Sequence, residues 1–543
     1  MAFSRDGIRH RPTVMGRRGM VSSANPISSL AGLRILMQGG NAVDAAVATA
    51  AALNVAEPYM SGIGGVGYMH IYSARDREHK IVDYVGLTPA TTNISDFDQE
   101  NKTEGPMSAL VPGACGGWFE ALRRFGTMDP ETVFAPAIEH AEQGIALTVS
   151  NNFFFEACAS GLLKYPASSS TYLLDRRAPE PGEVIVQSDL AETFRTVARS
   201  GPEAFYTGEI GEIIAAYIAE AGGLITKEDL AAFKPEWIDP VCTSYRGYNI
   251  WAPPPPCQAI QYLETLNIME GYDVASMGHN TSDTLHTFLE AVKLSIADRA
   301  EFAAIENPPT TGLLSKEFAA ARRKLIRDRA QLCGGDLYTA NKMEDEVLAG
   351  DPYAHLLNEC TTHFDTIDAD GNAVACTQSL GSGFGSNMVI PGTGVCLNNF
   401  MNWFDLEPKS PNAIGPAKKN EMCLSPIQIW DDYGLRLLIG TPGSHGILQT
   451  TPQMIMNVLD HNMNLQSAIE APRVKTVSEF TIGAEDRIGD EVFAELELRG
   501  HKIERLGDWT ASVGGGQGIM VDRETGSFTG GADPRRDGYA IGW

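Results

Sequence analysis

Thr361-Thr-His-Phe-Asp-Thr-Ile-Asp-Ala-Asp-Gly-Asn-Ala-Val-Ala375 lies two-thirds of the way along the chain and has the pattern of a β-hairpin. β-Branched residues recur on both sides of Asp370-Gly371, a dipeptide that favours a tight turn between two strands. Two threonines open the first strand. We interpret Thr361 as a masked catalytic nucleophile, which becomes exposed when the chain cuts itself between Cys360 and Thr361.

An N-terminal threonine carries both a hydroxyl and an amine on one residue. The hydroxyl can attack a carbonyl while the amine takes the proton that it loses. An α-amino group titrates near ~8, so about a tenth of it is the free base at neutral pH. An internal threonine has no such base, and the proposed chemistry therefore requires a break in the chain.

The length of the hairpin turn decides which residue lies opposite the nucleophile. A three-residue loop, 369–371, places Ser379 opposite Thr361, where a second hydroxyl could assist. A two-residue loop places Leu380 there instead and turns Ser379 to the other face of the sheet. The sequence leaves both registers open.

The composition excludes several classes of protein. Hydrophobic residues make up 43% of the chain and charged residues 20%, which is typical of a globular protein and not of a disordered one. The formal net charge is −26 and no dense basic run is present, so we expect no nucleic-acid partner. The nine cysteines are scattered, which indicates reduced thiols, and no spacing suggests metal ligands. We expect no metal and no other cofactor.

The N-terminal residues, 1–13, are polar and lack the apolar core of a secretory signal. The longest apolar stretch, 45–55, is too short and too rich in alanine to cross a bilayer. We therefore expect a cytoplasmic protein without membrane attachment. Removal of an upstream signal from the chain would change this expectation.

The first part of the chain is predicted to form two helices separated by Gly39-Gly40. Asn25 and Asn41 are suited to cap them, and the second helix, 42–54, is so rich in alanine and valine that it should be buried on most sides. The glycine-rich segment 62–67 has the spacing of a dinucleotide-binding fingerprint. A helix precedes it and a strand follows, however, which is the reverse of that motif. We expect a tight turn there and no nicotinamide or flavin site.

Two later segments bear on the site. Apolar residues at helical spacing predict a long amphipathic helix over 281–303. Residues 342–357 are partly acidic and include Gly350-Asp351-Pro352, which is typical of a surface loop. This loop comes just before the proposed cut, and a flexible approach would let the freed end leave.

A glycine-containing turn, 440–446, precedes a predicted helix over 447–459. Backbone amides at the start of a helix form a natural site for an anion, including the oxyanion of a tetrahedral intermediate. An ordinary strand-to-helix turn is the alternative interpretation. His445 within this turn is interpreted equally well as a substrate contact or as a packing residue. His363, two residues past the nucleophile, could assist cleavage or make a structural hydrogen bond.

These motifs resemble the γ-glutamyltranspeptidase family, in the right order and over nearly the whole chain. The hairpin is similar to the start of the family's small subunit. Further matching segments are Gly39–Ala46, Gly62–Gly65, Gly394–Asn399, Pro411–Pro416, Leu424–Pro426 and Thr441–Gly443. The resemblance implies an N-terminal-nucleophile hydrolase of the α/β (α+β) class, a four-layer αββα sandwich that forms one structural domain. Self-cleavage would leave residues 1–360 and 361–543 as associated large and small subunits.

The resemblance also implies roles for individual residues. Thr361 occupies the position of the family's catalytic threonine, whose hydroxyl is the nucleophile and whose α-amine is the base. Ser379 stands where the family usually has a threonine that supports the nucleophile. Gly443 and Ser444 stand at the two oxyanion amides, which are usually both glycines, and a backbone amide of serine can serve equally well.

The substrate-binding positions depart from the family pattern. Val85 occupies the position where glutamyl-specific members have an arginine that holds the substrate α-carboxylate. Trp403 lies near the position of an aspartate that holds the α-amino group in those members. Met422 and Cys423 occupy the positions of two serines. Loss of this charged clamp should weaken recognition of glutamate by on the order of several kcal/mol. We therefore expect amide hydrolysis without γ-glutamyl specificity. The residues expected to line the substrate site are Val85, Gly381, Phe400, Trp403, Met422, Cys423 and His445.

Three hypotheses follow. The first is a self-processing amidohydrolase whose substrate is a small amide such as oxamate, a β-lactam side chain or a glutamyl compound. The second is a genuine glutathione hydrolase or γ-glutamyltransferase, and the third is an unprocessed homologue without activity. The short segment 404–411 lacks the lid of some family members, and an open cleft favours water over an acceptor amine. Expected partners are the small-molecule substrate and the two subunits of the precursor, with a homodimer of such pairs left open.

Denaturing electrophoresis separates the enzyme hypotheses from the third. We expect two bands in purified active material, with Thr361 as the first residue of the smaller band by N-terminal sequencing. A single intact band from well-folded, active protein would contradict the nucleophile assignment, because the required amine would then be missing.

Overall fold

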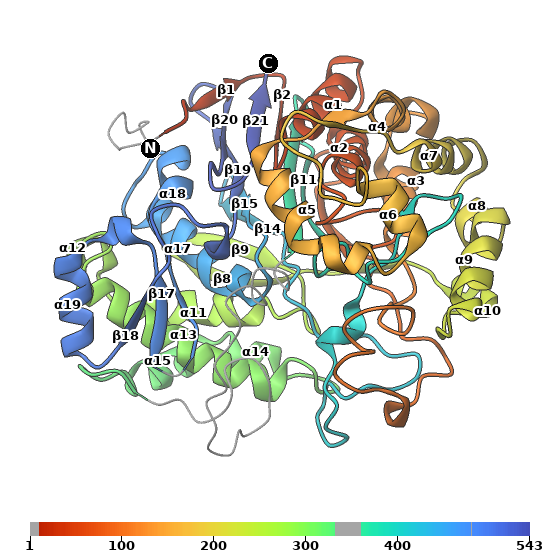
Figure 1. Cartoon of the computed structure of the whole chain (residues 1–543). Coiled ribbons are helices and arrows are strands. Elements are labelled where there is room, and N and C mark those ends of the chain that lie inside the picture. Colours follow the sequence, from red (N-terminus) through yellow and green to blue (C-terminus); the bar gives the residue numbers. More distant parts are fainter. Residues whose placement is uncertain (1–9, 332–359, 479) are drawn as a thin grey trace.

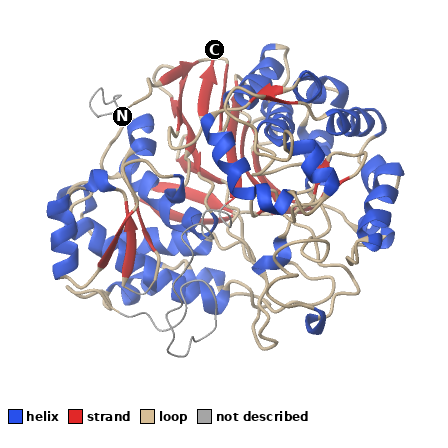
Figure 2. Ribbon diagram, viewed as in Figure 1, coloured by secondary structure: helices blue, strands red, loops and turns tan. Residues whose placement is uncertain are grey.

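The computed structural model describes residues 10–331, 360–478 and 480–543. Two seven-stranded antiparallel sheets lie face to face at its centre (Figure 2). The first sheet consists, in spatial order, of β21 (Tyr539–Gly542), β2 (Gly19–Ser23), β10 (Cys360–Asp368), β11 (Ala373–Gly381), β3 (Val66–Ser73), β4 (Glu78–Asp83) and β7 (Glu236–Ile238). The second consists of β1 (Val14–Gly16), β20 (Ser527–Ala532), β19 (Gln517–Asp522), β15 (Gly434–Gly440), β14 (Ile427–Asp431), β9 (Tyr248–Ala252) and β8 (Val241–Tyr245).

Helices cover the outer face of each sheet (Figure 1). On the first sheet they are α1 (Pro26–Met37) and α2 (Ala42–Ala56), backed by α3 (Ala114–Phe125) and α4 (Pro130–Gln143). On the second they are α11 (Ile260–Met269), α17 (Ile447–Leu459) and α18 (Leu465–Glu470), with α13 (Ser282–Phe302) behind α11. The four-layer αββα arrangement expected from the sequence is confirmed.

Smaller elements surround this sandwich. The remaining helices are α5 (Val149–Leu162), α6 (Pro166–Tyr172), α7 (Ser188–Ser200), α8 (Glu203–Tyr206), α9 (Glu209–Glu220), α10 (Lys227–Ala232), α12 (Val274–Met277), α14 (Thr310–Leu313), α15 (Lys316–Arg323) and α19 (Asp490–Leu498). The short strands pair as β5 (Ile145–Ala146) with β6 (Val184–Ile185), β12 (Val389–Ile390) with β13 (Val395–Cys396), and β17 (Thr481–Ala484) with both β16 (Val474–Thr476) and β18 (Lys502–Arg505).

The first two helices form where the sequence predicts them. The side chain of Asn25 accepts a hydrogen bond from the Ile27 amide, and Asn41 forms a capping box with Asp44. Every residue of α2 is buried, because α1 and α4 and the first sheet surround it. Its small alanine side chains allow these neighbours to approach closely.

The hairpin of β10 and β11 has the three-residue loop. The Asp368 amide donates to the Asn372 carbonyl at 3.1 Å, and Gly371 has a φ of +88°, in the left-handed region that favours glycine. The register breaks in a bulge between Cys360 and Thr362. Thr361 therefore lies at the one irregular point of a strand that is otherwise fully paired and buried.

The glycine-rich segment 62–67 joins α2 to β3, so a helix precedes it and a strand follows. The backbone packs closely here: a Cβ atom at Gly64 would lie 2.1 Å from the Cys396 carbonyl oxygen. This confirms the predicted tight turn. The long helix predicted over 281–303 is α13, whereas the loop predicted over 342–357 and Cys333 lie outside the described residues.

The other eight cysteines form no disulfide, and seven of them are buried, in agreement with the expected reduced thiols. Within the described ranges, no helix is both long enough and apolar enough to cross a bilayer.

Candidate active site

The structure describes the uncut chain, in which Cys360 and Thr361 are joined at the start of β10. Thr361 Oγ1 donates to Ser379 Oγ at 3.3 Å, and both side chains are almost completely buried. Ser379 Oγ in turn donates to the carbonyl oxygen of Cys360 at 2.5 Å and accepts from the Gly381 amide at 2.8 Å. One hydroxyl thus contacts the candidate nucleophile and the carbonyl of the candidate cleavage site.

Gly381 fixes the position of that hydroxyl. It has a φ of +105°, and a Cβ atom there would lie 2.2 Å from the side-chain oxygen of Asn399. Only glycine fits this conformation and this contact without displacement of the backbone. Gly381 was predicted to bind substrate; in the structure it contributes a backbone amide to Ser379.

Two charged residues that the sequence reasoning missed lie beside the threonines. Arg536 Nη1 donates to the Thr361 carbonyl oxygen at 3.4 Å, and Thr362 Oγ1 donates to Glu57 Oε2 at 3.5 Å. Burial raises the pKa of Glu57 to about 7, although the Arg536 guanidinium opposes this shift. The available signals in the sequence were an acidic residue directly after the apolar α2 and the adjacent arginines Arg535 and Arg536.

The turn that follows β15 contains the two residues predicted to supply oxyanion amides. Gly443 has a φ of +129° and Ser444 a φ of +54°, so both residues lie in the left-handed region. A non-glycine residue is uncommon there and adopts it at a cost in strain. Among the described residues, no hydrogen bond uses the amide of Gly443 or Ser444. The turn leads through a short 3-10 helix, Ser444–Gly446, into α17.

His363 connects this turn with the nucleophile strand. A Cβ atom at Gly440 would lie 2.3 Å from its ring, so the end of β15 packs directly on the imidazole. His363 Nδ1 lies 2.8 Å from Thr377 Oγ1, and Nε2 lies 3.2 Å from Asp365 Oδ1. Burial raises the pKa of Asp365, and the charge of His363 opposes that shift. These contacts support the structural interpretation of His363.

The structure brings together most of the residues predicted to bind substrate. Val85, Phe400, Met422 and Cys423 are buried in one apolar cluster, and Trp403 packs against it. The positions that would hold a charged clamp are therefore occupied by apolar side chains that pack in the core or against it.

His445 packs on Trp403. Their ring centroids are 4.8 Å apart, and the ring centroid of Phe400 lies 6.2 Å from that of Trp403. Desolvation of the partly buried imidazole lowers the pKa of His445 well below its usual value, and the Arg299 guanidinium adds to the effect. His445 is therefore a neutral ring at neutral pH, and it supplies packing surface without charge.

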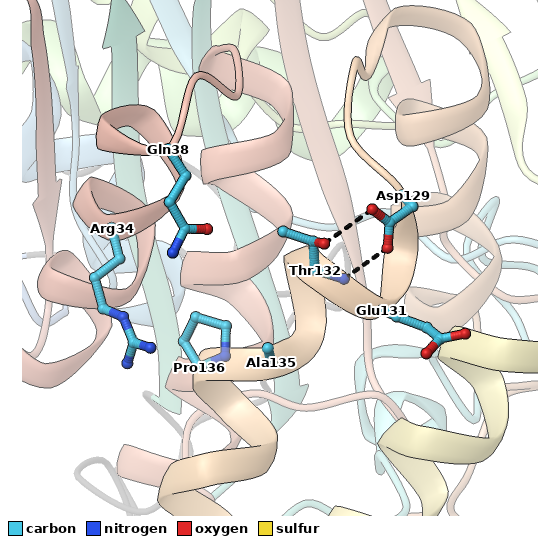
Figure 3. Close-up of a pocket in the computed structure, with 7 residues that line it drawn as sticks. All are labelled: Arg34, Gln38, Asp129, Glu131, Thr132, Ala135 and Pro136. Atoms are coloured by element: carbon cyan, nitrogen blue, oxygen red, sulfur yellow. Dashed lines mark hydrogen bonds between the residues drawn. The ribbon is translucent and has the colours of Figure 1, made fainter.

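A surface pocket between α1 and α4 offers no comparable chemistry (Figure 3). Its volume is about 440 Å³, and it is lined by Arg34, Gln38, Asp129, Glu131, Thr132, Ala135 and Pro136. The Asp129 carboxylate accepts from the amide and the hydroxyl of Thr132, and so caps α4. Arg34 pairs with Glu139. The polar groups of this pocket stabilise helices.

Comparison with known proteins agrees with this fold. The profile of the γ-glutamyltranspeptidase family matches residues 28–543. Over 544 residues the chain is 37% identical to the acylase ACY 1 proenzyme of Pseudomonas sp. (strain SE83), covering 97% of this chain and 94% of the relative. It is 32% identical over 557 residues to the glutathione hydrolase proenzyme of Bacillus subtilis (strain 168), covering 97% and 92%.

The crystal structure of cephalosporin acylase from Bacillus halodurans superposes with a TM-score of 0.89 at 32% identity, over 99% of this chain and 98% of that one. The two facing sheets with their helical layers define an N-terminal-nucleophile hydrolase. More specifically, the chain belongs to the γ-glutamyltranspeptidase family and is one of its hydrolases.

Replacement of Glu57 tests the electrostatics beside the threonines. The unfolded chain releases this proton near the usual pKa of 4.5 and the folded chain near 7, so the folded state binds more protons between these values. Stability therefore falls as pH rises through this interval, by on the order of 3 kcal/mol. Glu57→Gln should remove this contribution, as measured by urea unfolding at a series of pH values. The exposed control Glu212→Gln should retain the wild-type profile; a Glu57→Gln profile parallel to wild type would contradict the assignment.

Proposed function

We propose that this chain is a self-processing amidohydrolase, which cuts itself between Cys360 and Thr361 and then hydrolyses a small amide through a Thr361 acyl-enzyme. The observation that carries the proposal is the position of the Ser379 hydroxyl, 2.5 Å from the Cys360 carbonyl oxygen and 3.3 Å from the Thr361 hydroxyl. The Ser379 side chain thus holds the Thr361 hydroxyl in place and also polarises the Cys360 carbonyl that this hydroxyl would attack.

In the cleavage step, Thr361 Oγ1 attacks the carbonyl carbon of Cys360, and the Ser379 hydroxyl stabilises the oxyanion. The bond between this carbon and the Thr361 nitrogen then breaks. The nitrogen takes the proton that the Thr361 hydroxyl has lost, and an ester joins Cys360 to Thr361 Oγ1. Hydrolysis of this ester by water leaves a carboxylate on Cys360 and a free amine on Thr361.

In turnover, the new amine takes the proton of the Thr361 hydroxyl as Oγ1 attacks the substrate amide. The amides of Gly443 and Ser444 would donate to the developing oxyanion. The substrate C–N bond breaks, the proton passes to the departing amine, and an acyl ester remains on Thr361. A water molecule then attacks the ester, releases the acid and restores the nucleophile.

An acylase-like specificity fits the apolar character of the predicted substrate positions best. The apolar side chains of Val85, Met422 and Cys423 would favour an uncharged acyl chain, whereas they offer no partner to an α-carboxylate. Trp403 and His445 add two uncharged rings, tilted by 37° to one another. The acylase names of the Pseudomonas relatives and of the Bacillus halodurans structure support the same conclusion. A short amide such as oxamate is a further substrate of this class.

Glutathione hydrolysis or γ-glutamyl transfer is the second candidate, because the Bacillus subtilis relative carries the name glutathione hydrolase. It requires that other residues hold the α-amino and α-carboxylate groups of glutamate. The segment between Phe404 and Pro411 is short and would leave the cleft open to water. Water is then favoured over an amine as the second substrate, and hydrolysis over transfer.

Two substitutions test the proposed cleavage. Thr361→Ala should give a stable chain that is neither cut nor active, because both the nucleophile and its amine are lost. Ser379→Ala should slow maturation by about a hundredfold, the effect of removing one oxyanion donor. Gel densitometry over time measures both. Ser386→Ala, which removes another buried hydroxyl that donates to a backbone carbonyl, is the control and should mature normally. Full processing of Thr361→Ala would refute the proposal.

A panel of substrates tests the specificity. Mass spectrometry of the products should show a kcat/KM for amides with apolar acyl groups at least about tenfold above that for a γ-glutamyl chromogen, since one unsatisfied buried charge costs at least this much. The panel should include β-lactam side-chain amides and oxamate. Release of glutamate faster than release of every other acyl group would instead establish the second candidate.

A further inference from the structure

We propose that His286, Glu290 and His501 form a binding site for a divalent transition-metal ion such as Zn²⁺ or Co²⁺, remote from Thr361 in the sequence and in the fold. One ligand atom from each residue lies within 4.8 Å of the other two, and all three side chains are buried. Two imidazoles and a carboxylate are a common ligand set for such ions.

The positions of these residues follow from two elements. His286 and Glu290 are four residues apart on α13, so their side chains project from the same face of the helix. His501 comes just before β18 and brings its imidazole to that face. His286 Nδ1 and His501 Nε2 are 2.9 Å apart. Two nitrogens about 2.1 Å from one ion would be about 3.0 Å apart at an octahedral angle and about 3.4 Å apart at a tetrahedral one, so a tetrahedral ion requires the rings to separate by about 0.5 Å.

The Nε2 atom of His286, which faces away from His501, makes the kind of hydrogen bond that metal-binding histidines commonly make. His286 Nε2 lies 2.7 Å from the Arg327 carbonyl oxygen, which can only accept, so Nε2 carries the proton. The lone pair of the neutral ring is therefore on Nδ1 and faces His501. A metal-binding histidine commonly donates its other N–H to a backbone carbonyl, which fixes the ring and its tautomer.

Each neutral imidazole has one nitrogen lone pair for coordination. His501 is only 3% exposed, and its Nδ1 has no hydrogen-bond partner among the described residues. The ligand atom that the geometry assigns is His501 Nε2, so coordination would place the proton of this ring on Nδ1.

The charged neighbours limit which ion can bind. Lys293 donates to Glu290 Oε1 at 2.7 Å, and Arg499 pairs with Asp283. Lys293 and the Gln331 backbone amide, which donates to Glu290 Oε2 at 3.2 Å, compete for the carboxylate. This disfavours Mg²⁺ and Ca²⁺, since those ions depend on oxygen ligands. Ions that bind imidazole strongly retain two ligands that Lys293 does not contact.

The site links the two parts of the chain on either side of the proposed cut. His286 and Glu290 precede residue 360, and His501 follows it. A bound ion would thus join the large and small subunits by coordination. This role rests on the proposed cleavage, whereas the existence of the site does not.

Cobalt binding tests the site on the full-length protein. After treatment with a chelator, wild type should bind one Co²⁺ per chain with visible d–d absorption, Zn²⁺ should displace it, and the ion should raise the melting temperature. His501→Gln should bind at least about a hundredfold more weakly. His461→Gln is the matched control, since His461 faces another imidazole, His279, at 5.3 Å but belongs to no three-ligand cluster within the described ranges, and it should bind as wild type does.

Two further measurements keep the result unambiguous. Circular dichroism establishes that His501→Gln is folded, and Glu290→Gln replaces it if it is not. The uncut Thr361→Ala protein should bind Co²⁺ equally, so a failure of self-cleavage leaves this test intact. Absence of absorption from wild type at millimolar Co²⁺, or equal binding by wild type and by the folded ligand variants, would overturn the proposal.

Discussion

The hydroxyl of Ser379 has a single proton, and in the uncut chain it donates that proton to the Cys360 carbonyl oxygen. Its oxygen accepts from the Gly381 amide and from the Thr361 hydroxyl. The Thr361 hydroxyl and the Cys360 carbonyl, which would react with each other, therefore both contact Ser379 Oγ. The bulge in β10 makes these two contacts possible. In an unbroken register Cys360 would pair with Leu380, whereas the bulge pairs it with Gly381. The left-handed backbone of Gly381 then aims its amide at the serine.

This arrangement places a reactive bond at the start of a core strand. β10 lies between β2 and β11 in the first sheet, and all of its residues are buried. A break at its first residue would leave the ladder to both neighbours almost intact, because the hydrogen bonds of a sheet do not require a continuous chain. The same strand can therefore hold the sandwich together before and after cleavage. His363, two residues after Thr361, packs against Gly440 at the end of β15. This contact links the strand of Thr361 to the turn after β15.

Much of this site could be predicted from local sequence. The hairpin, the two capped helices and the turn before α17 each depend on residues close together in the chain, and turn chemistry and capping report them reliably. Glu57, Arg536 and the contact of His286 with His501 could not be predicted in this way, because the partners are 175 to 305 residues apart in the sequence. The choice between two hairpin registers also needed the structure, since the loop residues suit either turn.

The pairing of β2 with β21 has a consequence for the order in which the first sheet can assemble. β2 is built from residues 19–23, yet its partners in the first sheet are β10 and β21, and β21 is built from residues 539–542. A ribosome delivers β21 more than five hundred residues after β2. β21 is an edge strand of the first sheet, so β2 lacks one of its two partner strands until residues 539–542 have been synthesised.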